Sequence, residues 1–252
     1  MTELPKELKR CPLIETVFEV RFTSSLPDEA VFGVIYQALL PQFPQFQTVS
    51  LPILQIPPEV RKRDPKLNFQ THYHLISDNL VIGIGPKSIG FSNRAPYKGW
   101  QAFKEFILSA LDEIVKTKAI DTVQRSSIRY INIIHTPLFS ATRLCISLGT
   151  ENLASSAVTT FHTEIPQENG LLVVLQLNNN VGVSINGQQN QIASVIDIDA
   201  LCVEPKDKSS FQKGMSEGLD KLHILEKQTF FGLLTEDFLS SLEPVYDKKQ
   251  DF

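Results

Sequence analysis

Two carboxylates and two arginines in this chain have the residue types and the spacing that chemistry on a β-strand requires. Asp197 and Asp199 alternate with Ile196 and Ile198, so a strand would carry both carboxylates on one face. Such a pair can bind Mg²⁺, or it can divide acid and base work if the pKa of one carboxyl is raised. The same alternation also fits a strand with one buried and one solvated face, so a structural role stays open.

Arg125 and Arg129 lie four residues apart, which is two full periods of a strand. The residues at 128–134 are rich in β-branched and aromatic side chains and contain no Gly or Pro, which predicts a central strand. A central strand has little free surface for charge, so we expect at least one arginine to pair with a carboxylate. The candidate partners are Glu15, Glu19 and Asp197.

Basic residues also cluster in three other places. The groups are Arg61, Lys62, Arg63 and Lys66; Arg94, Tyr97 and Lys98 beside Trp100; and Lys6, Lys9 and Arg10 in the N-terminal arm. Positive charge next to aromatic rings is how proteins hold single-stranded nucleic acid without reading its bases. Ordinary solvated loop charge is the alternative. Prolines recur at 41–58, so we expect the first group to form the basic tip of a loop and not a helix.

Signals for metal, cofactor and nucleophilic chemistry are weak. His72 and His74 share one face of a predicted strand and could hold a metal only with a third ligand such as His135 or His162; a polar strand face explains them as well. No Gly-x-Ser-x-Gly elbow, P-loop or dinucleotide-binding glycine pattern occurs. We therefore expect no metal, no cofactor and no catalytic residue.

The composition is that of an ordinary globular protein: 252 residues, 42% hydrophobic and 21% charged. A net charge of −4 argues against a general nucleic-acid coat. Cys145 and Cys202 lie in apolar runs, which predicts buried, reduced thiols and a cytoplasmic location. No apolar signal segment and no run of about 18 apolar residues occurs, so we expect neither secretion nor a membrane span.

The hydrophobic periodicity predicts an α+β fold. Expected helices are 28–40, 99–118 and 209–231, with a short last one capped by Thr235; expected strands are 14–22, 69–76, 79–85, 88–93, 128–134, 143–148, 156–165, 171–178, 181–185 and 191–203. Each half, 1–136 and 137–252, thus combines antiparallel strands with a long amphipathic helix. We expect the halves to pack intimately as one structural unit, possibly with one continuous sheet.

Several segments together resemble a known family. They are Leu4-Pro5, residues 12–22 (PLIETVFEVRF), 129–132 (RYIN), 196–199 (IDID), Leu222-His223 and 230–235 (FFGLLT). This sequence is similar to a sporadically distributed bacterial protein family of about this length that has no established activity. The resemblance spans nearly the whole chain and implies one unit. The patchy distribution of the family implies a mobile or accessory role, such as phage defence or a toxin–antidote pair.

Binding of a protein partner is the function that these patterns favour. Aromatic residues gather near the end of the chain, and a sheet with a free edge can dock another protein. These aromatic residues are Phe230, Phe231, Phe238, Tyr246 and Phe252; closing the core is their alternative role. The competing functions are an enzyme that uses Asp197, Asp199 and an arginine, and an antidote that masks a toxin. Nucleic acid held by the basic loops and a homo-oligomer are further expected partners.

Overall fold

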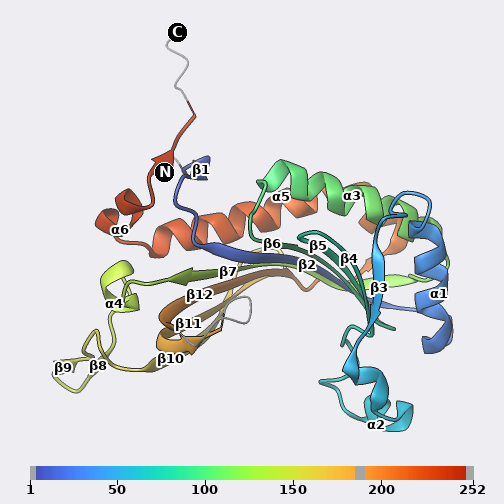
Figure 1. Cartoon of the computed structure of the whole chain (residues 1–252), viewed down its shortest axis with the longest axis horizontal. Helices are drawn as coiled ribbons and strands as arrows, with labels where there is room; N and C mark the ends of the chain where they lie inside the picture. The colour runs from blue at the N-terminus through green and yellow to red at the C-terminus, as the bar shows by residue number, and fades with distance from the viewer. Residues whose placement is uncertain (1–3, 185–190, 248–252) are drawn as a thin grey trace.

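A large antiparallel sheet with helices on one side forms the body of the protein (Figure 1). The computed structural model of the chain describes residues 4–184 and 191–247. Along the sheet the strands are β10 (Thr159–Pro166), β11 (Leu171–Val183), β12 (Gln191–Cys202), β7 (Thr122–Ile134), β2 (Leu13–Thr23), β6 (Ser88–Arg94), β5 (Leu80–Ile84), β4 (Tyr73–Ser77) and β3 (Gln47–Ser50); β13 (Lys206–Asp207) also pairs with β7. One continuous sheet therefore runs through both halves of the sequence.

Helices and short strands complete the fold. The helices are α1 (Asp28–Leu39), the 3-10 helix η1 (Pro52–Gln55), α2 (Pro58–Arg63), α3 (Trp100–Lys116), α4 (Leu138–Ala141), α5 (Lys208–Leu233) and α6 (Glu236–Ser241). The pairs β1 (Glu7–Leu8) with β14 (Pro244–Val245) and β8 (Ser147–Leu148) with β9 (Glu151–Asn152) are small separate ladders. No helix in the described residues is long and apolar enough to cross a membrane.

Strand β7 lies in the middle of the sheet, between β12 and β2. In the β2–β7 ladder Phe18 lies opposite Ile128, and in the β12–β7 ladder Ile198 lies opposite Tyr130. All four side chains are on the helix-covered face and are buried. The sequence-based prediction of a central strand at 128–134 is confirmed, and this strand is where the two halves meet.

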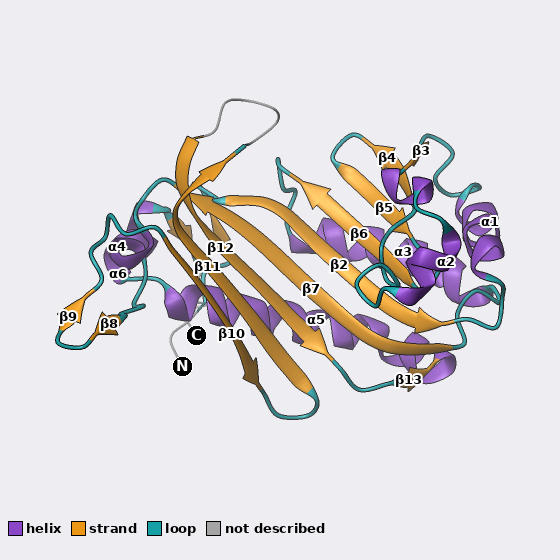
Figure 2. Cartoon of the chain, turned by 90° about the horizontal axis from the view of Figure 1, so that it is seen from below, coloured by secondary structure: helices purple, strands orange, loops and turns teal. Residues whose placement is uncertain are grey.

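The long helices form because apolar residues recur every three or four positions and give each helix one face to bury. Helix α3 buries a stripe that includes Phe103, Ile107 and Ile114. Helix α5 is capped by the Asp207 side chain, which accepts a hydrogen bond from the Ser210 N–H at 3.0 Å. Both helices lie on the same side of the sheet, and Figure 2 shows the middle of β12, β7 and β2 uncovered on the other side.

The helices predicted at 28–40, 99–118 and 209–231 are confirmed as α1, α3 and α5, with differences only at their ends. The Thr235 cap is also confirmed: its hydroxyl accepts a hydrogen bond from the Phe238 N–H at 3.3 Å.

The predictions for the proline-rich segment, for the strand at 143–148 and for the two buried thiols were wrong. The proline-rich segment contains η1 and α2, because Pro at the first helical positions fixes φ and needs no N–H there. Cys145 is exposed, because the strand predicted at 143–148 is reduced to the two residues of β8. Cys202, which was also predicted to be buried, is partly exposed. Residue 185 of the strand predicted at 181–185 and the aromatic Phe252 lie outside the described residues.

Replacing Phe18 by Ala tests the central pairing. Phe18 is 1% exposed in β2, so we expect the free energy of unfolding to fall by about 3–5 kcal/mol in urea titrations. Val158→Ala is the control, because Val158 is 75% exposed and its truncation should change stability by less than about 0.5 kcal/mol. Equal effects of the two substitutions would contradict the buried central position of Phe18.

Candidate functional site

The sheet face opposite α3 and α5 carries charged side chains from four neighbouring strands. Side chains alternate between the two faces of a strand, so the residues between the buried apolar ones point to this uncovered face. We call the following eight residues the charged face: Arg94 of β6, Glu15, Glu19 and Arg21 of β2, Arg125 and Arg129 of β7, and Asp197 and Asp199 of β12. The structure thus brings together the carboxylates and arginines that the sequence analysis singled out.

Arg129 and Asp197 form a two-pronged ion pair. The Nε of Arg129 donates to Oδ1 of Asp197 at 2.7 Å, and Nη2 donates to Oδ2 at 2.5 Å. Asp197 is only 7% exposed, whereas the Arg129 side chain is 46% exposed. The paired carboxylate raises the pKa of Arg129, so the guanidinium stays charged. The arginine therefore neutralises a buried carboxylate and still presents positive charge to solvent.

Glu19 lies between two arginines. Its Oε1 accepts hydrogen bonds from Nε of Arg21 at 2.7 Å and from Nη2 of Arg125 at 3.0 Å. Arg21 and Arg125 are direct partners across the β2–β7 ladder, and like charges in that position repel. Burial, and next the charge of Arg21, lower the pKa of Arg125. Glu19 is the carboxylate that offsets this repulsion, and Arg21 also lies 4.6 Å from the centre of the Phe69 ring.

Asp199 is the least satisfied carboxyl of the charged face. Its Oδ1 is buried and has no hydrogen-bond partner in the structure. Burial raises the pKa of Asp199 to about 6, although Arg125, Ser127 and Arg129 act in the opposite direction. Asp199 therefore differs from Asp197, whose two oxygens both accept hydrogen bonds from Arg129.

Arg94 ends the row at its outer side. Its Nε lies 3.5 Å from Oε1 of Glu15, and just over half of the Arg94 side chain is exposed. With Arg125 bound to Glu19 and Arg129 to Asp197, the expectation that at least one of these two arginines is paired is confirmed for both.

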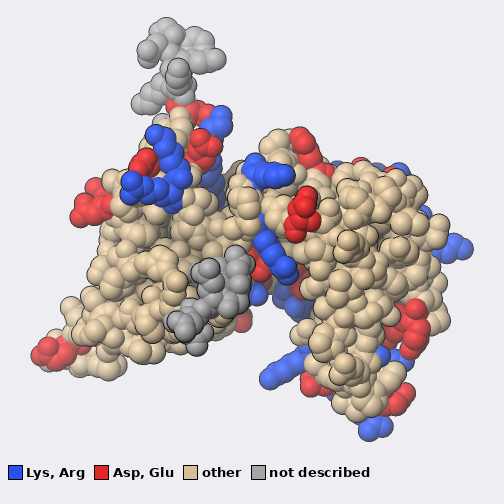
Figure 3. Space-filling model, viewed as in Figure 1, with Lys and Arg blue, Asp and Glu red and all other residues tan. Residues whose placement is uncertain are grey.

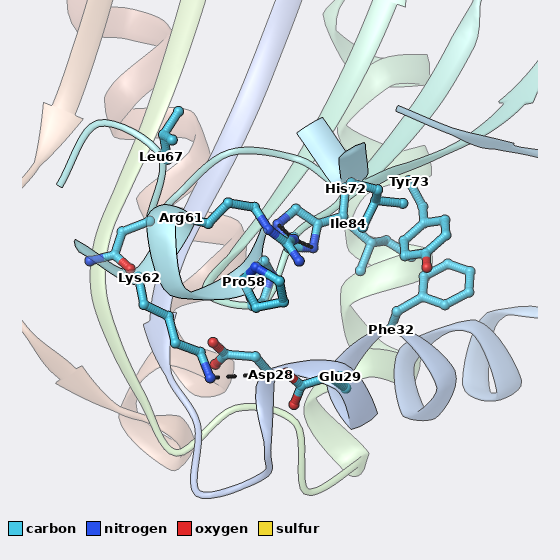
Figure 4. Close-up of a pocket in the computed structure, with 14 residues that line it drawn as sticks. Asp28, Glu29, Phe32, Pro58, Arg61, Lys62, Leu67, His72, Tyr73 and Ile84 are labelled. Carbon is cyan, nitrogen blue, oxygen red and sulfur yellow. Dashed lines mark hydrogen bonds and ion pairs between the residues drawn. The ribbon is translucent and has the colours of Figure 1, made fainter. Parts of the chain in front are cut away.

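Two basic residues of α2 contact other parts of the molecule (Figure 4). Nη1 of Arg61 lies 2.9 Å from Nε2 of His72, and Nζ of Lys62 lies 3.9 Å from Oε1 of Glu29 in α1. Together they line a small cleft of about 140 Å³. Arg63 is exposed on the same helix. Arg61 and Lys62 of this basic group thus contact other residues of the protein.

The histidines do not gather into a metal centre in the part of the chain that the structure describes, where no group of three or more His, Cys, Asp or Glu residues could hold an ion. His72 contacts Arg61, and burial lowers the pKa of both His72 and His74. His162 lies 3.8 Å from Glu164, an exposed acidic neighbour.

Arg94 and Trp100 are not neighbours in one basic and aromatic cluster, because they belong to opposite faces of the sheet. Arg94 lies on the charged face, next to Glu15. Trp100 begins α3 on the helical side, where its Nε1 donates to Asp220 at 3.1 Å and its ring stacks on His223 at 4.1 Å.

Sequence reasoning missed a second group of residues on the helical side. Glu226 of α5 is only 4% exposed and lines a cavity together with His223 and Tyr130. We call this the Glu226 cavity. A signal was present in the sequence. Glu226 lies four residues from both Leu222 and Phe230, so it belongs to the buried apolar stripe of α5.

The shape of the molecule leaves room beside the charged face. Figure 3, in the same view as Figure 1, shows the lower side hollowed between the part that carries α2 and the part that carries α4, with Lys and Arg side chains beside the hollow. The amino-acid sequence matches no model of a protein family, and the comparison with curated proteins gave no match. The geometry therefore carries the functional inference.

Replacing Glu19 by Gln tests the role of this carboxylate between two arginines. We expect the free energy of unfolding to fall by about 1–3 kcal/mol, because two facing guanidinium groups lose their shared counter-ion. Urea titrations measure the change. Asp112→Asn, an exposed carboxylate on α3, is the control and should have little effect. An unchanged free energy of unfolding in Glu19→Gln would show that the two arginines do not depend on Glu19.

The pKa of Asp199 predicts a pH-dependent stability. Its folded value of about 6 lies above the ordinary 3.8, so the folded protein binds this proton more tightly than the unfolded chain does. The contribution of Asp199 to stability is complete below about pH 4 and is lost as the pH rises toward 6. We therefore expect Asp199→Asn to stabilise the protein by about 1–3 kcal/mol at neutral pH, and to leave stability unchanged near pH 4. Denaturant titrations across this pH range measure the difference, and a gain that does not depend on pH would contradict the assignment.

Proposed function

We propose that this chain is a non-enzymatic binding protein that acts within a protein complex and docks its partner on the charged face. One observation carries the proposal: a row of eight charged side chains lies on a sheet face whose middle is covered by no described helix (Figure 2). Ordered charges of both signs on an uncovered sheet face offer a partner a defined pattern for electrostatic complementarity.

The charged face is arranged in advance of binding. Its side chains project from paired strands, and ion pairs fix the orientation of Arg125 and Arg129. Side chains that are already ordered lose less conformational entropy when a partner binds than mobile side chains do. Arginines are also enriched in protein interfaces because one guanidinium donates several hydrogen bonds in a plane.

The balance of charge favours a protein partner over nucleic acid. The face holds four carboxylates (Glu15, Glu19, Asp197 and Asp199) and four arginines (Arg21, Arg94, Arg125 and Arg129). Nucleic acid is attracted by an excess of positive charge, which this face does not have. A protein surface with alternating charges is the matching ligand.

Binding is also favoured over catalysis by Asp197 and Asp199. Both oxygens of Asp197 accept hydrogen bonds from Arg129, which leaves this carboxylate poorly placed to act as a base or as a metal ligand. Asp197 therefore serves better as part of a recognition surface.

The biological setting that we propose is an accessory role in the bacterial cytoplasm, in phage defence or as an antidote that masks a toxin. The resemblance to a sporadically distributed bacterial family supports the accessory role. The free thiols of Cys11, Cys145 and Cys202 support a reducing compartment.

Charge reversal at Arg94 tests the docking surface. Arg94 is half-exposed at the rim of the face, so Arg94→Glu changes the surface at the cost of one like-charge contact with Glu15, and circular dichroism checks that the variant is folded. The tagged chain is purified from its native host, the stoichiometric partner is identified, and affinity is measured with the purified partner. We expect Arg94→Glu to weaken binding about tenfold or more.

Lys116→Glu is the matched control, because it reverses an exposed charge on the helical side. It should leave the affinity for the partner unchanged. A partner that binds wild type and Arg94→Glu equally well would contradict docking on the charged face. A dimer of this chain that dissociates on Arg94→Glu would identify the partner as a second copy.

A further inference from the structure

The Glu226 cavity is a second concave site, on the opposite side of the sheet from the charged face. It has a volume of about 310 Å³ and lies between the N-terminal arm, the loop before α3, β7 and α5. This volume is at the lower end of the range of small-molecule pockets. Its aromatic wall consists of Tyr97, Trp100, Tyr130, His223, Phe230 and Phe231.

Contacts among the rings hold the aromatic wall in place. The hydroxyls of Tyr97 and Tyr130 lie 3.3 Å apart, and the Tyr130 hydroxyl lies 3.1 Å from Nδ1 of His223. Trp100 stacks on His223 and is anchored by its hydrogen bond to Asp220. The wall is therefore rigid before any ligand arrives.

Glu226 is the polar group that this wall surrounds. Its side chain is 4% exposed, lines the cavity, and has no hydrogen bond or ion pair with the residues that the structure describes. Burying a carboxyl group without a partner costs free energy. An apolar residue at this position of the α5 stripe would pack with Leu222 and Phe230 without that cost, so folding alone does not explain a glutamate here.

We propose that the Glu226 cavity binds a small organic cation with a flat apolar body, an arylalkylamine or an aromatic amidine, with the Glu226 carboxylate as its counter-ion. Rings in the wall attract a cation through their negative faces. A carboxylate receives two parallel hydrogen bonds from an amidinium group. The ligand supplies the partner that Glu226 lacks.

Glu226 is the acidic group at the aromatic wall, and the other charged side chains that line the cavity are Glu7, Lys6, Lys98 and Lys227. His223 is neutral near pH 7, because burial lowers its pKa to about 4. Burial also raises the pKa of Tyr130, Tyr97 and Cys11, so these groups are uncharged as well. Among the described residues, Lys227 is the cation that acts on Glu226, and burial lowers the pKa of Lys227. At the rim, Lys6 pairs with Asp247 at 3.0 Å and Lys98 is exposed.

Binding of a cation would change the protonation of Glu226. Burial raises the pKa of Glu226 to about 8, so the empty site holds a neutral acid near pH 7. A bound cation stabilises the carboxylate, so the proton leaves for solvent as the ligand enters. The affinity for a cation should therefore increase from pH 6 to about pH 8.

The tryptophan fluorescence of the full chain provides the test, because Trp100 is the only tryptophan in the sequence. The probes are benzamidine, neutral benzamide and anionic benzoate, which share one ring and differ in charge. We expect saturable binding of benzamidine, with release of a proton in calorimetry, and binding at least about tenfold weaker for the other two probes.

Two variants complete the experiment. Glu226→Gln should weaken benzamidine binding about tenfold or more and abolish proton release. Glu217→Gln is the matched control, since it makes the same substitution on the exposed side of α5. If Glu226→Gln does not fold, the comparison of the three probes on the wild-type chain still tests the proposal. Three results would each overturn the proposal: no saturable signal with benzamidine, benzamide or benzoate bound as tightly, or unchanged affinity in a folded Glu226→Gln variant.

Discussion

The pairing of β2 with β7 is the interaction on which the rest of the structure depends. It joins residues about a hundred positions apart and places both strands in the middle of the sheet. Because side chains alternate along β7, this strand contributes residues to two sites. Arg129 points to the charged face, and its neighbour Tyr130 points to the Glu226 cavity. A shift of one residue in this register would exchange the two faces and destroy both sites.

The two sides of the sheet differ in whether their buried carboxylates are paired with arginine. On the charged face, each of Glu19 and Asp197 is matched by arginine, so the strands hold ordered charge at little electrostatic cost. On the helical side, Glu226 is buried without such a partner, and burial raises its pKa to about 8. The first arrangement suits recognition of a surface that carries charge of both signs. The second suits a ligand that brings the missing charge into the protein.

The helices divide these roles. Helices α3 and α5 bury the apolar stripe of the sheet and also build the wall of the Glu226 cavity, where Trp100 of α3 stacks on His223 of α5. At the far end, Arg61 and Lys62 of α2 lie next to His72 and Glu29 (Figure 4).

The amino-acid sequence by itself determined the α+β class, the long helices, the central strand and the shared faces of Arg125 with Arg129 and of Asp197 with Asp199. These features follow from the repeat of apolar residues along the sequence, about every 3.6 residues in a helix and every 2 in a strand, which is a local property. Only the tertiary structure decided which groups meet. Arg125 and Glu19 are 106 positions apart in the sequence, and Arg129 and Asp197 are 68 apart. At such separations the strand register determines which residues become partners. The Glu226 cavity was likewise decided by packing, because burial of one glutamate depends on which face of α5 meets the sheet and the N-terminal arm.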